Sequence, residues 1–115
     1  MHDTPTRTMY RYVEDAFDHF NRELFDNNLP KPLITFQREK GCLGIFMYRR
    51  WRNREEGYIN EIALNPMYFV THNPLELFQT IVHEMCHLWQ FEYGKPSRAG
   101  YHNREWAQKM EAVGL

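Results

Sequence analysis

The chain has 115 residues, a formal net charge of -1, 43% hydrophobic residues and 16% aromatic residues, so we expect residues 1–115 to form a single small globular domain. The near-neutral charge excludes a global attraction to nucleic acid or to an acidic membrane, and any such affinity requires a local patch. Two cysteines, Cys42 and Cys86, are too few for a disulfide framework, and we expect both to be reduced thiols.

The chain has no segment typical of a bilayer span or of a secretory signal. No apolar stretch approaches the length of about 18 residues that a spanning helix needs. No basic start is followed by an apolar run and a small-residue cleavage site. We therefore expect a cytoplasmic protein that is neither secreted nor bound to a membrane.

The first expected element is an amphipathic helix from Arg7 to Asn27. Its apolar residues recur at three- and four-residue steps, and its charged residues fall elsewhere on the helical wheel. The apolar positions are Met9, Val13, Ala16, Phe17, Phe20 and Leu24. Two prolines in the segment from Asn27 to Pro32 end the helix, because proline lacks an N–H donor and disfavours helix at the residue before it.

Three strands are expected next, from their content of strand-favouring residues and from the turn residues between them. The first runs from Leu33 to Arg38, the second from Ile45 to Trp51 and the third from Gly57 to Leu64. Asn65-Pro66 ends the third strand.

A long helix is expected to begin with Asn73 as N-cap, Pro74 at its first position and Glu76 in its first turn, and to reach Tyr93. Apolar side chains cover most of its circumference, so this helix should be buried. These side chains are Leu77, Phe78, Ile81, Val82, Met85, Leu88 and Trp89.

A last helix completes the expected fold. Gly94 and Pro96 end the long helix, and the last one runs from His102 to Val113 with Trp106 and Met110 facing inward. The expected fold class is α+β, with a small three-stranded sheet packed against an N-terminal helix, a buried helix and a C-terminal helix.

The buried helix contains the segment His83-Glu84-Met85-Cys86-His87, the arrangement found in zincins. Residues four apart are separated by only about 40° around a helix axis, so both imidazoles leave one face and can share one cation. Burying His83, Glu84 and His87 without partners would cost several kcal/mol of hydration, and a metal ion removes that cost. The sequence therefore predicts a zincin-like fold with one zinc ion per chain.

A catalytic zinc ion usually takes three protein ligands and leaves a fourth position for water, so a third ligand must come from elsewhere in the chain. We predict His102, because it begins the last helix and imidazole suits zinc. Glu105 is the alternative, at a distance downstream that resembles the zincins with a glutamate ligand. A further alternative is that His83 and His87 are ordinary side chains bonded to carbonyl groups.

Glu84 lies about 100° around the helix axis from His83, where it can reach a water on the metal. It is the predicted general base, which takes a proton from that water and passes it to the leaving amine. Gln79 and Glu76 share the face of His83 and are candidates for lining the cleft. Cys86 points away from the ligand face, so we expect it to pack in the core.

The chain resembles the SprT-like zinc metallopeptidases, the group that includes the Spartan proteases, over nearly its whole length. The segments that carry the resemblance are Asn27-Asn28-Leu29-Pro30, Cys42-Leu43-Gly44-Ile45-Phe46, Ile59-Asn60-Glu61-Ile62-Ala63-Leu64, the His83 to His87 motif, and His102-Asn103-Arg104-Glu105-Trp106. The resemblance implies that His83, His87 and His102 are zinc ligands and that Glu84 is the catalytic acid and base.

The resemblance also implies a substrate class and a place in the cell. It suggests proteins that are bound or crosslinked to DNA, which would place the chain at the nucleoid or in a nucleus. Many relatives continue into a cysteine-rich zinc ribbon, whereas this sequence stops at Leu115 without those cysteines. Dependence on DNA is therefore left open.

The densest positive cluster is a candidate nucleic-acid site formed by Arg49, Arg50, Trp51, Arg52 and Arg54. Arginines neutralise phosphates, and an aromatic ring stacks on an unpaired base with a gain of about 1 to 3 kcal/mol, which favours single-stranded DNA. The alternative is a solvated hairpin tip whose arginines pair with Glu55, Glu56 and Glu61.

Three functions are compatible with these motifs. The first is a monomeric zinc endopeptidase whose extended protein substrate lies along a sheet edge formed by Tyr58 to Leu64. The second is a non-catalytic, zinc-stabilised module that binds nucleic acid. The third is a hydrolase of a small amide, because the motif specifies water activation and not the acyl group.

Overall fold

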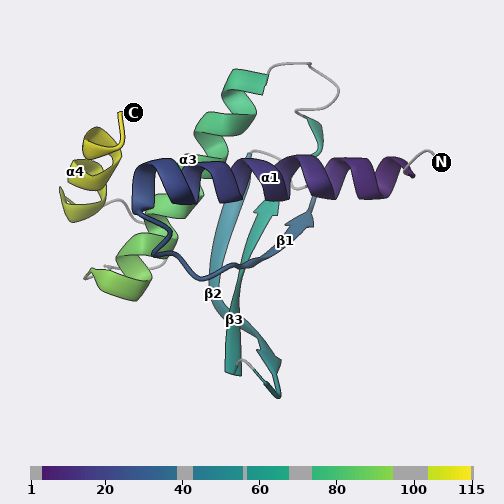
Figure 1. Cartoon of the computed structure of the whole chain (residues 1–115), viewed down its shortest axis with the longest axis horizontal. Coiled ribbons are helices and arrows are strands. Elements are labelled where there is room, and N and C mark those ends of the chain that lie inside the picture. Colours follow the sequence, from purple (N-terminus) through teal and green to yellow (C-terminus); the bar gives the residue numbers. More distant parts are fainter. Residues whose placement is uncertain (1–3, 39–42, 56, 68–73, 95–103, 115) are drawn as a thin grey trace.

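The structure is a computed structural model and describes residues 4–38, 43–55, 57–67, 74–94 and 104–114. Figure 1 shows the elements in chain order: α1 (Pro5–Phe25), β1 (Leu33–Phe36), β2 (Gly44–Asn53), β3 (Gly57–Leu64), α3 (Pro74–Tyr93) and α4 (Arg104–Ala112). Within the described residues the fold is α+β with a mixed three-stranded sheet and the N-terminal, buried and C-terminal helices that the sequence predicts.

Helix α1 begins and ends at residues with cap geometry. The side-chain oxygen of Thr4 accepts a hydrogen bond from the Arg7 N–H at 3.3 Å, and Pro5 occupies the first turn, where its missing N–H costs nothing. Asp26, with a φ of 54°, is the left-handed residue that ends the helix. The predicted helix therefore exists, but it starts two residues before Arg7 because Pro5 is its first position.

Asn21 fixes the turn that leads out of α1. Its side chain is 7% exposed and forms two hydrogen bonds with Leu29. The amide nitrogen Nδ2 donates to the Leu29 carbonyl at 3.0 Å, and the oxygen Oδ1 accepts from the Leu29 N–H at 3.1 Å. This pairing holds Leu29 against the core and directs the chain toward β1.

Replacing Asn21 by Ala is expected to lower the free energy of unfolding by about 2 kcal/mol, because both Leu29 backbone groups lose their buried partner. Urea unfolding followed by circular dichroism measures this. Asn28→Ala is the matched control in the same turn, and its exposed side chain predicts a change within about 0.5 kcal/mol. Equal effects of the two substitutions would show that the Asn21 pairing contributes nothing specific.

Strand β3 is the centre of the sheet, whose strand order is β1-β3-β2. It pairs in parallel with β1 from Leu33 opposite Glu61 to Phe36 opposite Leu64, and antiparallel with β2. The residues from Glu61 to Leu64 are therefore bonded on both sides, so the predicted substrate edge from Tyr58 to Leu64 is wrong for these four residues. A sheet edge in the described part of the chain lies instead on the outer side of β2.

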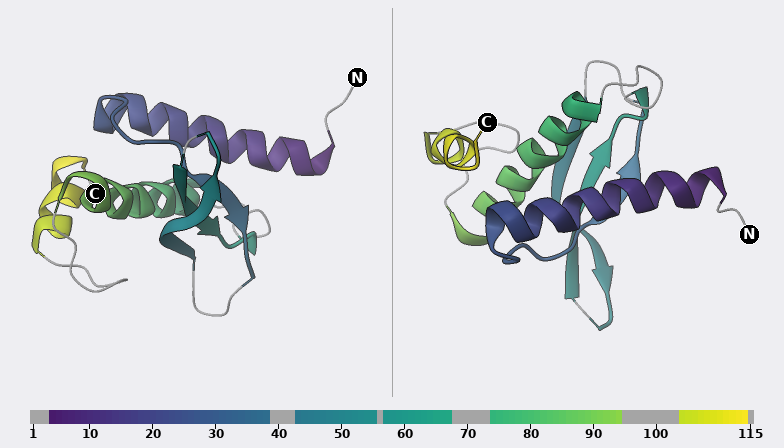
Figure 2. Two further views of the ribbon diagram at one scale, coloured as in Figure 1. Left: turned by 90° about the horizontal axis from the view of Figure 1, so that it is seen from below. Right: turned by 45° about the horizontal axis from the view of Figure 1, so that its top comes forward.

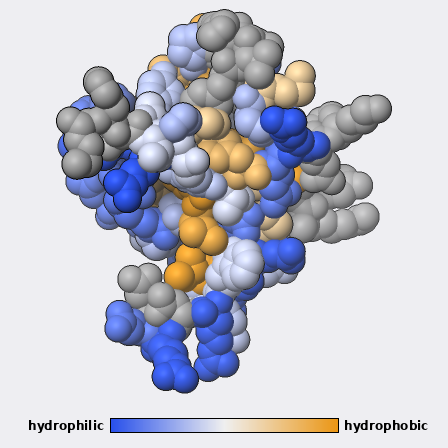
Figure 3. All heavy atoms as spheres, turned by 90° about the vertical axis from the view of Figure 1, so that its right-hand side faces the viewer, coloured by the Kyte–Doolittle hydropathy of each residue, from blue (hydrophilic) through white to orange (hydrophobic). Residues whose placement is uncertain are grey.

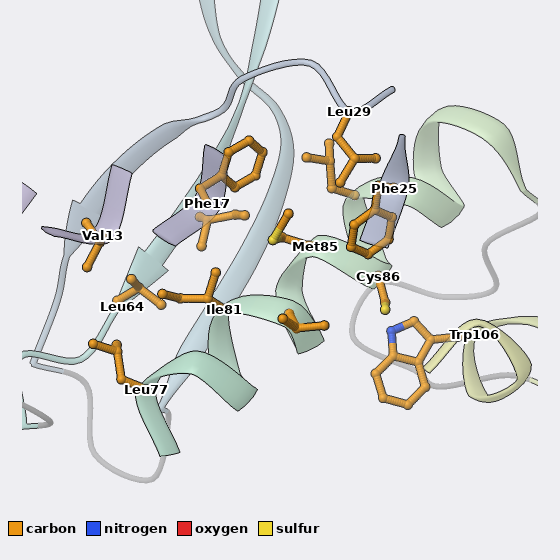
Figure 4. Packing of buried hydrophobic residues seen from close by; sticks show 13 residues of the cluster. Val13, Phe17, Phe25, Leu29, Leu64, Leu77, Ile81, Met85, Cys86 and Trp106 are labelled. Atoms are coloured by element: carbon orange, nitrogen blue, oxygen red, sulfur yellow. The ribbon is translucent and has the colours of Figure 1, made fainter. Parts of the chain in front are cut away.

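The core lies between the sheet and the two long helices. Buried residues from α1, the turn after it, β3, α3 and α4 form one cluster, shown in Figure 4. Its members are Val13, Phe17, Phe25, Leu29, Ile62, Leu64, Leu77, Ile81, Val82, Met85, Cys86, Leu88 and Trp106. Helix α4 lies along the side of α3 that faces away from the sheet (Figures 1 and 2).

The opposite face of the sheet is organised around Glu61, which is only 2% exposed. Side chains alternate between faces along a strand, so Glu61 points away from the core that Ile62 enters. Its carboxylate accepts hydrogen bonds from Thr35 Oγ1 at 2.6 Å, Trp51 Nε1 at 2.6 Å and Gln37 Nε2 at 3.4 Å. These bonds join β1, β2 and β3 through one buried charge.

Helix α3 is buried along most of its length, as its apolar sequence predicts. Its helical conformation is described from Pro74 to Tyr93, whereas the predicted N-cap Asn73 lies outside the described residues. In the described ranges, no helix combines the length and the apolar character that a membrane crossing requires.

Candidate metal centre

His83, Glu84 and His87 lie in the middle of α3 and form a group that can hold a metal ion. Their ligand atoms all lie within 4.8 Å of one another. The two imidazole rings are 5.2 Å apart between centroids, because the four-residue spacing places them on one helix face. Both histidines are half-buried, so part of each side chain remains accessible to solvent.

Glu84 is the most buried member of the group, at 5% exposure. Burial raises the pKa of its carboxyl group from 4.5 to about 7, because the ionised form loses its hydration. A cation held by the neighbouring histidines would favour the ionised form instead. A carboxyl group in such surroundings is suited to transferring a proton near neutral pH.

Trp106 forms one wall of the group. Its ring centroid lies 4.7 Å from that of His83 in an edge-to-face arrangement and 5.1 Å from that of His87 in a stacked one. The indole is buried and comes from the first turn of α4. Helix α4 therefore limits the rotation of both imidazoles.

Cys86 belongs to the core, as predicted, and is a free thiol. Figure 4 shows it beside the indole of Trp106. Burial raises the pKa of the thiol to about 12, and Glu84 adds to this rise while Lys109 opposes it. Cys86 is not a member of the group of His83, Glu84 and His87 that can hold a metal ion. The second cysteine, Cys42, lies outside the described residues.

The predicted third ligand, His102, also lies outside the described residues. Helix α4 begins two residues later at Arg104, and its Trp106 contacts both histidines. The alternative ligand, Glu105, accepts a hydrogen bond at Oε1 from Gln90 Nε2 at 2.9 Å and is not a member of the metal-binding group.

Gln79 and Glu76, predicted to line the cleft, are not members of this group either. Gln79 is exposed and Glu76 is half-buried on the first two turns of α3. Their roles remain predictions.

Gly44, the first residue of β2, lies directly against the group. A Cβ atom at this position would be 2.7 Å from Thr80 Cγ2, 3.2 Å from Glu84 Oε2 and 3.3 Å from Glu84 Cγ. Only a residue without a side chain fits this approach. The start of the edge strand is thus brought next to the carboxylate of Glu84.

Replacing Gly44 by Ala is expected to lower the free energy of unfolding by about 1 to 3 kcal/mol, because the added methyl forces Thr80 and Glu84 to move. Adding Thr80→Ser, which removes the closest methyl and keeps the hydroxyl, should recover part of that loss. A urea-unfolding double-mutant cycle measures the coupling. Strictly additive effects would contradict the close approach.

Comparison with known proteins places the chain in a family. The sequence profile of the SprT-like family matches residues 13–115. The chain belongs to the SprT-like family. A Salmonella typhimurium protein described as "Uncharacterized protein in mucB 3'region" is 46% identical over 59 residues, which make up 50% of this chain and 80% of that protein. The resemblance expected from the sequence is thus confirmed.

The basic cluster of this SprT-like chain lies on the β2–β3 hairpin, which extends beyond the helices (Figures 1 and 2). Figure 3 shows this projection covered by strongly hydrophilic residues. The structure divides the cluster between two faces. The guanidinium carbons of Arg49 and Arg52 lie 5.7 and 5.9 Å from the ring centre of Tyr58, whereas the Trp51 indole is bonded to Glu61 on the opposite face.

One expectation about the hairpin is wrong, and another stays a prediction. The carboxylate of Glu61 accepts from Trp51, Thr35 and Gln37, so the part of the alternative reading that pairs arginines with Glu61 is wrong. Arg50 and Arg54 are exposed, and their role in binding nucleic acid stays a prediction.

Sequence reasoning missed three residues next to the SprT-like motif. Gly44 approaches Glu84 from another element, and no local pattern signals such a contact. Trp106 was expected to face inward, but not to touch both imidazoles. Phe91 follows His87 by one helical turn and stacks on Tyr48, and its four-residue spacing from His87 was the signal that could have revealed it.

Proposed function

We propose that this chain is a zinc-dependent endopeptidase that hydrolyses peptide bonds with metal-activated water. The observation that carries the proposal is the convergence of the His83, Glu84 and His87 ligand atoms within 4.8 Å on one buried helix. Membership of the SprT-like family supports the same reading.

The residues present fit a zinc ion. His83, His87 and His102 would hold it, because neutral imidazole nitrogens are preferred zinc ligands and three protein ligands leave one position open. The Trp106 contacts with both described histidines support His102, because they bring the start of α4 to the site. Zinc supplies Lewis acidity, which polarises a carbonyl group and lowers the pKa of water.

Glu84 transfers the proton in this proposal. Its carboxylate takes a proton from the attacking water and delivers it to the nitrogen of the leaving amine. Burial behind Gly44 and Thr80 keeps bulk water from competing for this carboxylate. His83 and His87 are half-buried, so part of the group remains accessible to a peptide.

The substrate binds along β2 in this proposal, instead of along β3. An extended peptide can add a strand to the outer edge of β2, which begins at Gly44 beside Glu84. The resemblance to SprT-like metallopeptidases suggests proteins that are bound or crosslinked to DNA as the substrates.

Digestion of casein and of histones by the zinc-loaded chain tests the proposal. Each substrate is incubated with and without a chelator, and with and without single-stranded DNA. Cleavage that the chelator abolishes and zinc restores is the expected result. Absence of cleavage from a chain with one tightly bound zinc ion and four protein ligands would favour the non-catalytic nucleic-acid module instead.

A further inference from the structure

We propose that Tyr48, Arg49, Tyr58 and Phe91 form a subsite that receives an acidic side chain of the peptide substrate. This inference rests on the proposed endopeptidase function and adds a specificity to it. Tyr48, Arg49 and Tyr58 belong to the β2–β3 hairpin and Phe91 to α3, and together they form the hairpin subsite.

The helical position of Phe91 places the hairpin subsite next to the metal group. Phe91 follows His87 by four residues, which corresponds to about 40° around the axis and about 6 Å along it. It follows Glu84 by seven residues, which leaves only about 20° between them. Phe91 therefore continues the face of α3 that carries the metal group, one turn beyond His87.

Aromatic contacts connect this face of α3 to the β2–β3 hairpin. The Tyr48 and Phe91 rings stack with centroids 4.7 Å apart and an interplanar angle of 24°. The guanidinium carbon of Arg49 lies 5.6 Å from the centre of Phe91 and 5.7 Å from that of Tyr58. Tyr48 and Tyr58 are 54% and 60% exposed. The result is an aromatic floor with a cation above it, open to solvent.

The backbone of Arg49 is held in an unusual conformation. Its φ is 47°, and it lies within the irregular register between Met47 and Trp51. A non-glycine residue in this region is strained, so other contacts must offset the strain. The Arg49 N–H donates to Asn60 Oδ1 at 2.7 Å, and Asn60 Nδ2 donates to Glu92 Oε1 at 3.1 Å. Asn60 thus links the bulge to the end of α3.

The charge of the hairpin subsite favours an anionic ligand. Arg52 adds a second guanidinium group, 5.9 Å from the centre of Tyr58. Glu92 of α3 is an acidic neighbour, linked to the Arg49 backbone through Asn60, so two guanidinium groups stand against one carboxylate; the carboxylate of Glu61 accepts from Trp51 on the other face of the sheet. A carboxylate of the substrate can therefore pair with Arg49 above the two tyrosine rings.

The spacing indicates which substrate residue reaches the hairpin subsite. An extended peptide on the edge of β2 advances about 3.3 Å per residue, as the strand does, and Arg49 lies five residues beyond Gly44, the residue beside Glu84. An acidic side chain about three to five residues to one side of the scissile bond would reach Arg49.

A peptide is favoured over single-stranded nucleic acid as the occupant. Trp51, the aromatic residue of the predicted nucleic-acid site, donates its indole N–H to Glu61 on the face opposite the hairpin subsite. The face that carries Arg49 adjoins the metal group through Phe91.

Mapping of cleavage sites in casein by mass spectrometry tests the specificity. We expect Asp or Glu to be enriched at one fixed offset, about three to five residues from the cut. Arg49→Gln keeps the N–H that bonds Asn60 and should lower the enrichment by about three-fold. Arg7→Gln, which removes an equal charge from the first turn of α1, should leave it unchanged.

Peptide binding provides a readout that does not require turnover. Fluorescence anisotropy measures binding of labelled ten-residue peptides to the zinc-loaded Glu84→Gln chain. Each peptide consists of alanine and serine with a single Glu, whose position changes from one peptide to the next. A matched peptide with Gln at the same position is the comparison. A Glu peptide should bind about three-fold more tightly than its Gln partner, and Arg49→Gln should remove the difference.

Distinct outcomes separate this inference from the proposed function. Cleavage without an acidic preference, or equal losses in Arg49→Gln and Arg7→Gln, would overturn the hairpin subsite and leave the endopeptidase intact. Binding of oligothymidylate that Arg49→Gln abolishes, with no preference for Glu peptides, would assign the surface to nucleic acid. No cleavage together with Arg49-dependent Glu-peptide binding would reject the endopeptidase and retain the hairpin subsite.

Discussion

Replacing Glu84 by Gln is expected to lower kcat/KM for peptide cleavage by about 100-fold or more while zinc stays bound. The amide has nearly the same shape as the carboxyl group but cannot accept and return a proton, and loss of general acid–base catalysis costs about 10² to 10⁴ in rate. Cleavage of a fluorogenic peptide, measured together with zinc content by mass spectrometry, gives both quantities.

The matched control for this substitution is Glu111→Gln, which changes an exposed carboxylate of α4 and should leave kcat/KM unchanged. The thermal midpoint of the metal-free Glu84→Gln chain should not fall, because a neutral amide at a position only 5% exposed loses less hydration than a carboxylate. Undiminished turnover in the zinc-loaded variant would rule out Glu84 as the general base.

Replacing His87 by Ala is expected to remove most of the stabilisation that zinc gives to the folded chain. A ligand present at 100 times its dissociation constant stabilises a protein by about 2.7 kcal/mol, and a variant that binds it poorly gains far less. Urea unfolding with and without zinc measures the difference. His19→Ala, an exposed histidine of α1, should gain as much from zinc as the unmodified chain does.

The same experiment separates the two candidates for the third ligand. His102→Ala should lose the zinc-dependent gain as His87→Ala does, whereas Glu105→Gln should keep it, because Glu105 is bonded to Gln90 and lies outside the metal-binding group. The reverse pattern would assign the third ligand to Glu105.

Helix positions were predictable because their signals are local. The apolar spacing of α1 and the continuous apolar surface of α3 identified both helices, and the four-residue step from His83 to His87 placed both imidazoles on one face. Helix boundaries depended on single residues. Pro5 after the Thr4 cap extended α1 beyond the predicted start at Arg7.

Strand order was not predictable in the same way, because no local pattern states which strand lies in the centre of a sheet. The segment from Tyr58 to Leu64 was expected to be an edge, but its residues Glu61 to Leu64 pair in parallel with β1, although β2 lies between β1 and β3 in the sequence. The run of five buried residues from Asn60 to Leu64 is typical of a central strand.

Most features of the site that could not be predicted from the sequence are contacts between elements that are distant in the chain. The approach of Gly44 to Glu84, the bond from Trp51 to Glu61 and the packing of Trp106 on His83 each join two different elements. Such contacts arise from the way the elements pack, so residue type and spacing within one element do not reveal them. The metal-binding group itself was predictable because it lies on one helix.

The most direct test of a hydrolytic zinc centre is the zinc K-edge X-ray absorption spectrum of the zinc-loaded chain. We predict three imidazole nitrogens and one oxygen from water, all at about 2.0 to 2.1 Å. A shell of four protein ligands, or a sulfur at about 2.3 Å, would contradict the account, because the metal would then have no open position for a substrate.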